Sequence, residues 1–203
     1  MDIDLKGMGK DAIYKLLVGA VVPRPIAWVT TLNDAGKVNA APFSCYTFVS
    51  SQPPLVAVSM GRVRGGAKDS SRNAVARGEF VVNVAQSSQA KELHLSSTEH
   101  PPEVSETELL GIATAPSVRL ATPRIAEAPV AMECRYVQTI EFGELRAQLV
   151  IGEVLHMHVR DDLYRDGKID SVALDPLGRL GGPRYATLGE ILTLPSVEVS
   201  PSA

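Results

Sequence analysis

The sequence contains little cysteine and no long hydrophobic run. Its 203 residues include two cysteines, Cys45 and Cys134, which form no Cys-x-x-Cys pair. Two cysteines are too few for a disulfide framework or a cysteine-rich metal site. The longest apolar run, Leu16–Pro23, is far shorter than the ~20 residues that span a bilayer. The chain also begins without the charged-then-apolar order of a signal peptide, so we expect a soluble protein of the reducing cytoplasm, without a membrane partner.

An excess of positive charge and a glycine-rich nucleotide motif are missing as well. The chain has 20 Lys and Arg against 23 Asp and Glu, a net charge of −3. Nucleic-acid-binding domains are usually basic, so we expect no nucleic-acid partner. No Gly-x-Gly-x-x-Gly motif precedes a helical segment, which argues against a Rossmann site that holds a nicotinamide nucleotide tightly.

Residues 62–77 are the basic exception in an acidic chain. This stretch carries five Lys or Arg residues, and Asp69 is its one acidic residue. Such a stretch suits a small anion, for example one phosphate group. A solvated helix face explains the charges as well, and charge alone favours that interpretation.

Short apolar and alternating runs dominate the chain and indicate a mainly β protein. We expect strands at Ile26–Leu32, Val38–Val49, Leu55–Met60, Phe80–Ala85, Val130–Phe142 and Gln148–Val159, and helices at Lys10–Leu17 and Asp69–Arg77. The polar region Gln86–Gly111 is interpreted as a helical excursion or lid. About six antiparallel strands with helical insertions predict a closed or partly closed barrel in a single domain, 1–203, with a core at about 10–190 and a tail at 195–203.

Two segments have the residue types of a ligand site. Ser70 and Ser71 stand where a helix begins, and the first N–H groups of a helix attract anions. Lys68 and Arg72 add positive charge, so the segment fits a terminal phosphate, although an ordinary helix cap has the same residues. The segment Asn39–Ser44 places small residues and a proline in a strand, which suits a flat ligand or a simple β-bulge.

Six segments in order make the sequence resemble a known family. They are RPIAWVTT, NAAPFS, PPLVAVS, KDSSRN, FVVNV and the late segment LGRLGGPRY. Together they resemble the flavin reductase-like FMN-binding split-barrel family. The resemblance implies a six-stranded antiparallel split barrel with helical additions, and a homodimer with FMN in a groove at the subunit interface. Members reduce flavin with NADH or NADPH, often for a partner monooxygenase, whereas others are electron carriers.

The resemblance also implies a set of flavin contacts. They are Arg24, Thr30, Thr31, Asn39, Ala40, Ala41, Pro42, Phe43, Ser44, Ser59, Lys68, Asp69, Ser70, Arg72 and Tyr185. The strand 39–44 would line the isoalloxazine ring, Ser59 would lie near the ribityl chain, and 68–72 would surround the phosphate. Arg24, Thr30 and Thr31 would add contacts from the preceding strand. Tyr185 would close the site or support the dimer.

The expected function is an FMN-dependent NAD(P)H oxidoreductase, a flavin reductase in particular. Hydride transfer between nicotinamide and flavin is the chemistry of the cofactors themselves, so we assign no catalytic residue. We also assign no metal ligand, and we interpret His94 and His100 as part of a solvated loop. An FMN electron carrier that does not use NAD(P)H and a non-enzymatic flavin-binding protein remain as alternatives.

Overall fold

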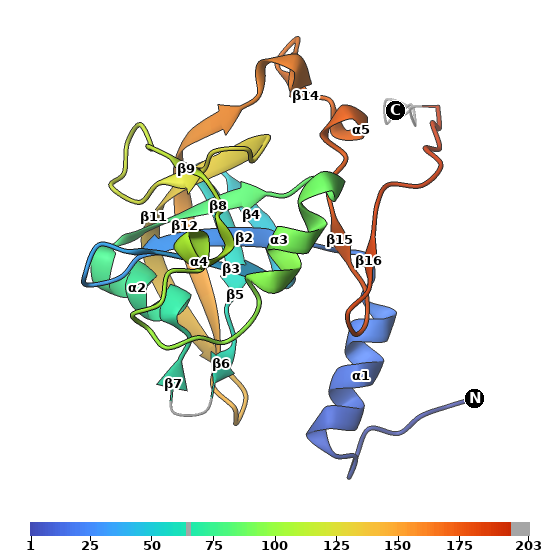
Figure 1. Cartoon of the computed structure of the whole chain (residues 1–203). Coiled ribbons are helices and arrows are strands. Elements are labelled where there is room, and N and C mark those ends of the chain that lie inside the picture. The colour runs from blue at the N-terminus through green and yellow to red at the C-terminus, as the bar shows by residue number, and fades with distance from the viewer. Residues whose placement is uncertain (64–65, 196–203) are drawn as a thin grey trace, which may run out of the picture.

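A curled antiparallel sheet of seven strands forms the body of the molecule. The computed structural model describes residues 1–63 and 66–195 (Figure 1). The sheet contains β2 (Ala27–Leu32), β3 (Val38–Phe43), β4 (Tyr46–Ser51), β5 (Pro54–Ser59), β8 (Glu79–Val84), β11 (Val130–Phe142) and β12 (Ala147–Val159). Their spatial order is β3-β2-β8-β11-β12-β5-β4. The predicted mainly β class is confirmed.

The sheet has seven strands where six were expected, because the predicted strand Val38–Val49 is divided. The division falls at Ser44–Cys45, whereas Pro42 lies inside β3, an edge strand of the sheet. Since β3 and β4 lie at opposite edges of the sheet, these two residues carry the chain across the open side of the barrel. The Cys45 carbonyl there accepts the Ser59 N–H at 2.8 Å. Pro42 is tolerated because an edge strand has N–H positions outside the ladder.

The alternation of side chains along β2 separates two hydrophobic clusters. Ala27 and Val29 point into the barrel, where they pack with Val58, Phe80, Val82 and Val150. Trp28 points outward into a second cluster, with Leu93 and Ile125. The Trp28 indole N–H donates to Ser96 Oγ at 3.0 Å, so the outer cluster fastens the region after β8 to the barrel.

The barrel interior leaves no room for a side chain at one position of β12. A Cβ atom on Gly152 would lie 2.4 Å from Cζ of Phe80, whose ring is fully buried. The glycine therefore lets the Phe80 ring approach the backbone of β12, and it is needed for packing.

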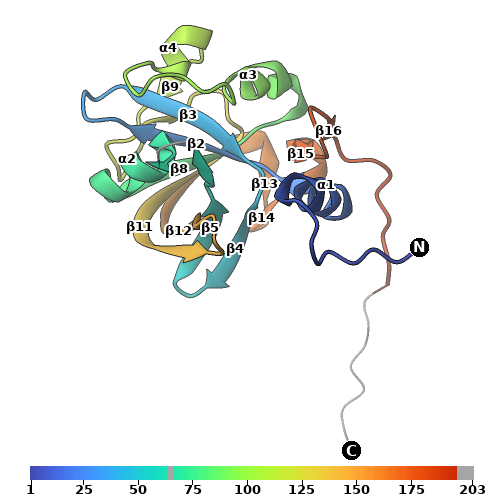
Figure 2. The same ribbon diagram turned by 90° about the horizontal axis from the view of Figure 1, so that it is seen from below.

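The helices agree with the sequence pattern. α2 (Asp69–Arg77) has the predicted bounds and ends at Gly78, which has a left-handed φ of 72°. The excursion after β8 contains η1 (Ser87–Gln89), α3 (Ala90–Leu95) and α4 (Glu106–Leu110). Both α3 and α4 contact β3, and Figure 2 shows them beside it. The helix predicted at Lys10–Leu17 is α1 (Lys10–Ala20).

The remaining elements are short. They are β1 (Arg24–Pro25), β6 (Arg62–Val63), β7 (Gly66–Ala67), β9 (Thr114–Ala115), β10 (Arg124–Ile125), η2 (Asp161–Leu163), β13 (Tyr164–Arg165), β14 (Lys168–Ile169), α5 (Ser171–Leu174), β15 (Gly178–Arg179) and β16 (Tyr185–Ala186). The expected tail, 195–203, lies outside the described residues except for Pro195. Within the described chain, no helix combines the length and hydropathy needed to cross a membrane.

Candidate functional site

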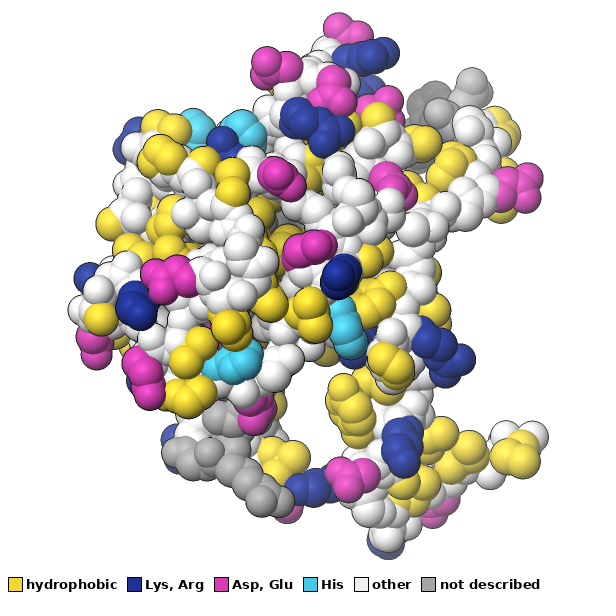
Figure 3. Space-filling view, in the orientation of Figure 1, with side chains coloured by type: hydrophobic (Ala, Val, Ile, Leu, Met, Phe, Trp, Pro, Cys, Tyr) yellow, Lys and Arg dark blue, Asp and Glu magenta, His cyan; other side chains and the backbone are white. Residues whose placement is uncertain are grey.

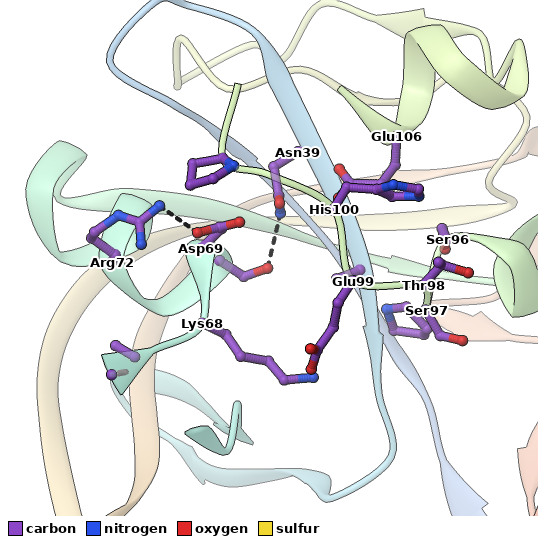
Figure 4. Close-up of a pocket in the computed structure, with 16 residues that line it drawn as sticks. Asn39, Lys68, Asp69, Arg72, Ser96, Ser97, Thr98, Glu99, His100 and Glu106 are labelled. Atoms are coloured by element: carbon purple, nitrogen blue, oxygen red, sulfur yellow. Dashed lines mark hydrogen bonds and ion pairs between the residues drawn. The ribbon is translucent and has the colours of Figure 1, made fainter. Parts of the chain in front are cut away.

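A pocket of about 480 Å³ lies between the start of α2, the outer edge of β3 and the segment that connects α3 to α4. Figure 4 shows the side chains that converge on it. Its lining residues are Asn39, Ala41, Pro42, Gly66, Ala67, Lys68, Asp69, Ser70, Arg72, Ser96, Ser97, Thr98, Glu99, His100, Pro102 and Glu106. The volume falls within the range of small-molecule sites.

The beginning of α2 forms the cationic wall of the pocket. The first N–H groups of the helix have no intrahelical acceptor, and no side chain caps them. Lys68 precedes the helix, and its ammonium lies 5.7 Å from the centroid of the Phe43 ring. The Arg72 guanidinium pairs with Asp69 on the same helix, and half of the Arg72 side chain is exposed. Helix dipole, Lys68 and Arg72 together favour an anion here.

The strand β3 forms the floor. Asn39 donates its side-chain N–H to Ser70 Oγ at 2.9 Å, which joins the floor to the cationic wall. Ala41 and Pro42 follow along the pocket with side chains too small to fill it. A floor of small residues gives a flat ligand access to the backbone.

The segment after α3 forms the opposite wall. Asn33 holds it from the β2–β3 turn, with the side-chain N–H donating to the Pro102 carbonyl at 3.1 Å. Ser105 begins α4, and its hydroxyl donates to the Val38 carbonyl at 2.6 Å. In Figure 4 the side chains of Lys68 and Glu99 point toward one another across the mouth of the pocket.

Glu106 is a buried carboxylate in this wall. Its Oε2 accepts the Ala40 N–H at 3.0 Å, and the residue is only 6% exposed. Burial raises the pKa of Glu106 above its usual 4.5, and the negative charge of Asp69 raises it further. The Ala40 N–H and the charge of His100 oppose this shift. The pocket thus has a cationic end at α2, and Glu106 and His100 line its other end near α4.

Seven of the fifteen predicted contacts line the pocket. They are Asn39, Ala41, Pro42, Lys68, Asp69, Ser70 and Arg72. Ala40 and Phe43 lie directly beneath it, through the contacts to Glu106 and Lys68. The structure therefore brings together two segments that are about 25 residues apart in the sequence.

Thr30 and Thr31 lie behind the pocket, in fully buried positions. Thr31 Oγ1 accepts from the Asn73 side chain at 3.2 Å, so it supports α2 from below. Thr30 donates to the Pro123 carbonyl at 2.7 Å. Both side chains hold the frame of the site and do not reach the pocket surface.

Arg24 and the residues near it lie in another part of the molecule. The guanidinium of Arg24 donates to the carbonyls of Val18 and Val21 at 2.9 and 2.8 Å, and to that of Leu180 at 3.0 Å. Its Nε lies 3.4 Å from Ser44 Oγ. Arg24 thus ties α1 and the β15–β16 hairpin to the end of β3, beside a second pocket of about 320 Å³.

Tyr185 and Ser59 do not line the main pocket either. The Tyr185 hydroxyl accepts from Arg179 at 2.7 Å and lies 3.0 Å from His94 Nδ1. This contact joins the β15–β16 hairpin to α3. Ser59 ends β5, where its N–H bonds to Cys45.

The sequence interpretation did not identify the wall opposite α2. Glu99, His100 and Glu106 line the pocket, but none stands in a recognisable motif. The segment 86–111 was interpreted from the sequence as a helical excursion or lid, and His100 as part of a solvated loop, whereas the structure places His100 in the pocket lining. Among residues 1–63 and 66–195, no three His, Cys, Asp or Glu side chains gather closely enough to bind a metal ion.

Comparisons with known proteins show the family and the fold of the chain. The model of the flavin reductase like domain family matches residues 18–173. The crystal structure of nitrilotriacetate monooxygenase component B from Bacillus cereus superposes with a TM-score of 0.92 and 37% identity, covering 96% of this chain and 98% of that one.

Two further solved structures extend the comparison. The 2-nitrobenzoate 2-nitroreductase NbaA of Pseudomonas fluorescens has a TM-score of 0.90 and 33% identity, with 100% of both chains covered. A Shewanella frigidimarina protein with a split barrel domain has a TM-score of 0.85 over 97% of this chain and 100% of that one. Its identity is 19%, so this likeness shows the fold alone.

Proposed function

The chain belongs to the family of flavin reductase-like domains, and from this premise we propose that it is an FMN-dependent oxidoreductase that passes hydride from NADH or NADPH to flavin. The observation that carries the proposal is the pocket that joins the uncapped start of α2 to the small-residue floor of β3. The two segments match the two parts of FMN, a terminal phosphate and a flat ring.

The residues at the start of α2 would hold the phosphate. Lys68 and Arg72 would supply charge, Ser70 a hydroxyl donor, and the helix its free N–H groups. Charge-assisted hydrogen bonds of this kind are about twice as strong as neutral ones. The Asp69–Arg72 pair orients the guanidinium at the edge of the pocket.

The strand β3 would receive the ring, through the floor formed by Asn39, Ala41 and Pro42. A bound flavin supplies the hydride-accepting chemistry itself. The protein's part is to orient the ring, exclude water from one face of it and leave the other face open to the donor. No side chain has to move a proton in this step, so the lack of an assigned catalytic residue is consistent with the mechanism.

The physiological acceptor is proposed from the structural neighbours. One of them is a monooxygenase component B, and we propose that this chain likewise supplies reduced flavin to a partner monooxygenase. A nitroaromatic acid is the second candidate acceptor, because the other close neighbour is a 2-nitrobenzoate nitroreductase. A cytoplasmic site of action fits both, since Cys45 is a free, exposed thiol.

The active form is proposed to be a homodimer. α1 has no buried residue, although Tyr14, Leu16 and Leu17 are apolar and exposed. Figure 3 shows hydrophobic side chains gathered on this helix, at the lower right. A helix of 11 residues is marginal in water without tertiary packing, so a second subunit would account for its stability.

Flavin affinities test the proposed cofactor. We expect the fluorescence of FMN to be quenched at a lower protein concentration than that of riboflavin, because only FMN carries the terminal phosphate. FAD, in which that phosphate is joined to AMP in a pyrophosphate and is no longer terminal, should bind more weakly than FMN. Equal affinities for FMN and riboflavin would show that the start of α2 is not a phosphate site.

Light scattering tests the proposed assembly. The wild type should have twice the chain mass of 21.7 kDa at micromolar concentration. Leu17→Asp, which places a charge on the apolar face of α1, should shift the mass toward the monomer, whereas Lys15→Gln on the same helix should not. A monomeric wild type with flavin bound would contradict the assembly.

A further inference from the structure

Glu106 has an unusual position for a charged group in a pocket that attracts anions. It extends from the first turn of α4 to the edge of the sheet, where its Oε2 accepts the Ala40 N–H at 3.0 Å. The residue is 6% exposed, and it lines the same pocket as Lys68 and Arg72. Among the described residues, no lysine or arginine forms an ion pair with it.

The charged side chains around Glu106 come from the start of α2 and from the segment that connects α3 to α4. The negative charge of Asp69, on α2, raises the pKa of Glu106, and the charge of His100, in the α3–α4 segment, lowers it. Glu99, Lys68 and Arg72 complete the charged lining, and the last of these is paired with Asp69. An anionic ligand in the pocket would therefore be repelled by the carboxylate of Glu106, whose negative charge its neighbours neutralise only in part.

We propose that Glu106 is the proton-binding residue of the pocket, so that an anionic ligand binds together with a proton taken up by this carboxylate. The inference rests on the proposed FMN site and adds a regulation to it. The site then prefers anionic ligands more strongly as the pH falls.

The physical basis is the reciprocity of two binding events at nearby sites. A negative charge brought into the pocket disfavours a second one, which raises the proton affinity of Glu106. By linkage, protonation of Glu106 raises the affinity for the anion by the same factor. Burial already raises the pKa of this carboxyl, so the proton is taken up closer to neutral pH than by an exposed glutamate.

The test compares two isosteric variants of α4. Glu106→Gln removes the charge and keeps an oxygen that accepts the Ala40 N–H. Glu108→Gln is the matched control, because Glu108 lies two residues further along, is 66% exposed and pairs with Lys37 at 3.6 Å on the surface. The dissociation constants of FMN and riboflavin are measured for both variants and for the wild type between pH 5.5 and 8.5.

At pH 8.5 we expect Glu106→Gln to bind FMN about three- to tenfold more tightly than the wild type, and the difference to shrink toward pH 5.5. Glu108→Gln should follow the wild type throughout. Riboflavin, which is uncharged, should show a much smaller difference. The titration of the FMN phosphate is common to all three proteins and cancels in the comparison.

Calorimetry gives a second readout of the same proposal. FMN binding to the wild type in two buffers of different ionisation enthalpy should reveal proton uptake that exceeds the uptake by Glu106→Gln. A ratio of dissociation constants that is independent of pH, or equal uptake in the two proteins, would overturn the proposal while leaving the FMN site intact. If no protein bound FMN at any pH, the proposed function itself would fail, and this inference with it.

Unfolding experiments guard against a trivial explanation. Because the folded-state pKa of Glu106 is raised, its contribution to stability is complete below pH 4.5 and is lost as the pH rises through the folded-state value. Glu106→Gln should therefore unfold at an equal or higher urea concentration than the wild type at pH 8. A lower midpoint would mean that the carboxylate supports the fold in its charged form, which contradicts the proposal.

Discussion

Removing the positive charges at the start of α2 should weaken the binding of FMN and spare that of riboflavin. The change is Lys68→Ala combined with Arg72→Ala. A hydrogen bond to a charged group contributes about 1.5–3 kcal/mol. That figure is reduced here because half of the Arg72 side chain is exposed and Asp69 already shares its charge. We expect a loss of about 1–3 kcal/mol in total, which is about 5- to 150-fold in the dissociation constant of FMN.

The single variants refine this prediction. Arg72→Ala leaves the Asp69 carboxylate unpaired beside the phosphate, so it should cost more than Lys68→Ala, which leaves the ion pair in place. Lys91→Ala is a suitable control, because Lys91 is an exposed lysine of the neighbouring helix α3 that does not line the pocket. Its FMN affinity should equal that of the wild type.

The assay is fluorescence quenching with both ligands, accompanied by urea unfolding of each variant. An exposed ion pair contributes little to stability, so the unfolding midpoints should change by less than the equivalent of about 1 kcal/mol. Unchanged FMN affinity in the double variant would mean that the charges only solvate a helix face. A parallel loss for FMN and riboflavin would mean that these residues support the ring pocket, and the phosphate assignment would be refuted.

Two further predictions concern the core and the thiols. Gly152→Ala should lower the free energy of unfolding in urea by about 1–3 kcal/mol, because its Cβ would meet the buried Phe80 ring at 2.4 Å. Gly19→Ala, in open space on α1, should not destabilise the protein, and equal stabilities of the two variants would refute the packing argument. With a thiol reagent, the exposed Cys45 should react in the native protein. Cys134 should react only after unfolding, because it is buried and burial raises the pKa of its thiol. Two reactive thiols in the native state would contradict the buried placement of Cys134.

Local signals in the sequence predicted the elements that depend on local physics. α2 was predicted with its observed bounds, because the polar residues Asp69–Ser71 of its first turn and Gly78 after its last residue mark the two ends in the sequence. Alternation along 130–142 predicted β11 in the same way. The division between β3 and β4 has a different cause. Closure of the barrel places it at Ser44–Cys45, two residues after Pro42, which lies inside the edge strand β3.

For the same reason, only part of the candidate site was predicted from the sequence. The floor and the cationic wall are contiguous segments with a recognisable residue order, so Asn39 and Lys68 were identified from the sequence. Glu106 was missed because its contact with Ala40 spans 66 residues and is created by the packing of α4 on the sheet edge. Arg24 was expected at the flavin, but its side-chain donors reach α1, the β15–β16 hairpin and Ser44, a set of contacts that only the folded chain brings together.

Anaerobic stopped-flow mixing of the FMN-loaded protein with NADH, and separately with NADPH, tests the central claim most directly. The account predicts that at least one donor bleaches the absorbance of the oxidised flavin, with a rate constant in the range of about 1–1,000 s⁻¹ that is usual for enzymes. If neither donor bleached the flavin while a chemical reductant did, the protein would be a flavin-binding electron carrier, and the proposed use of NAD(P)H would be contradicted.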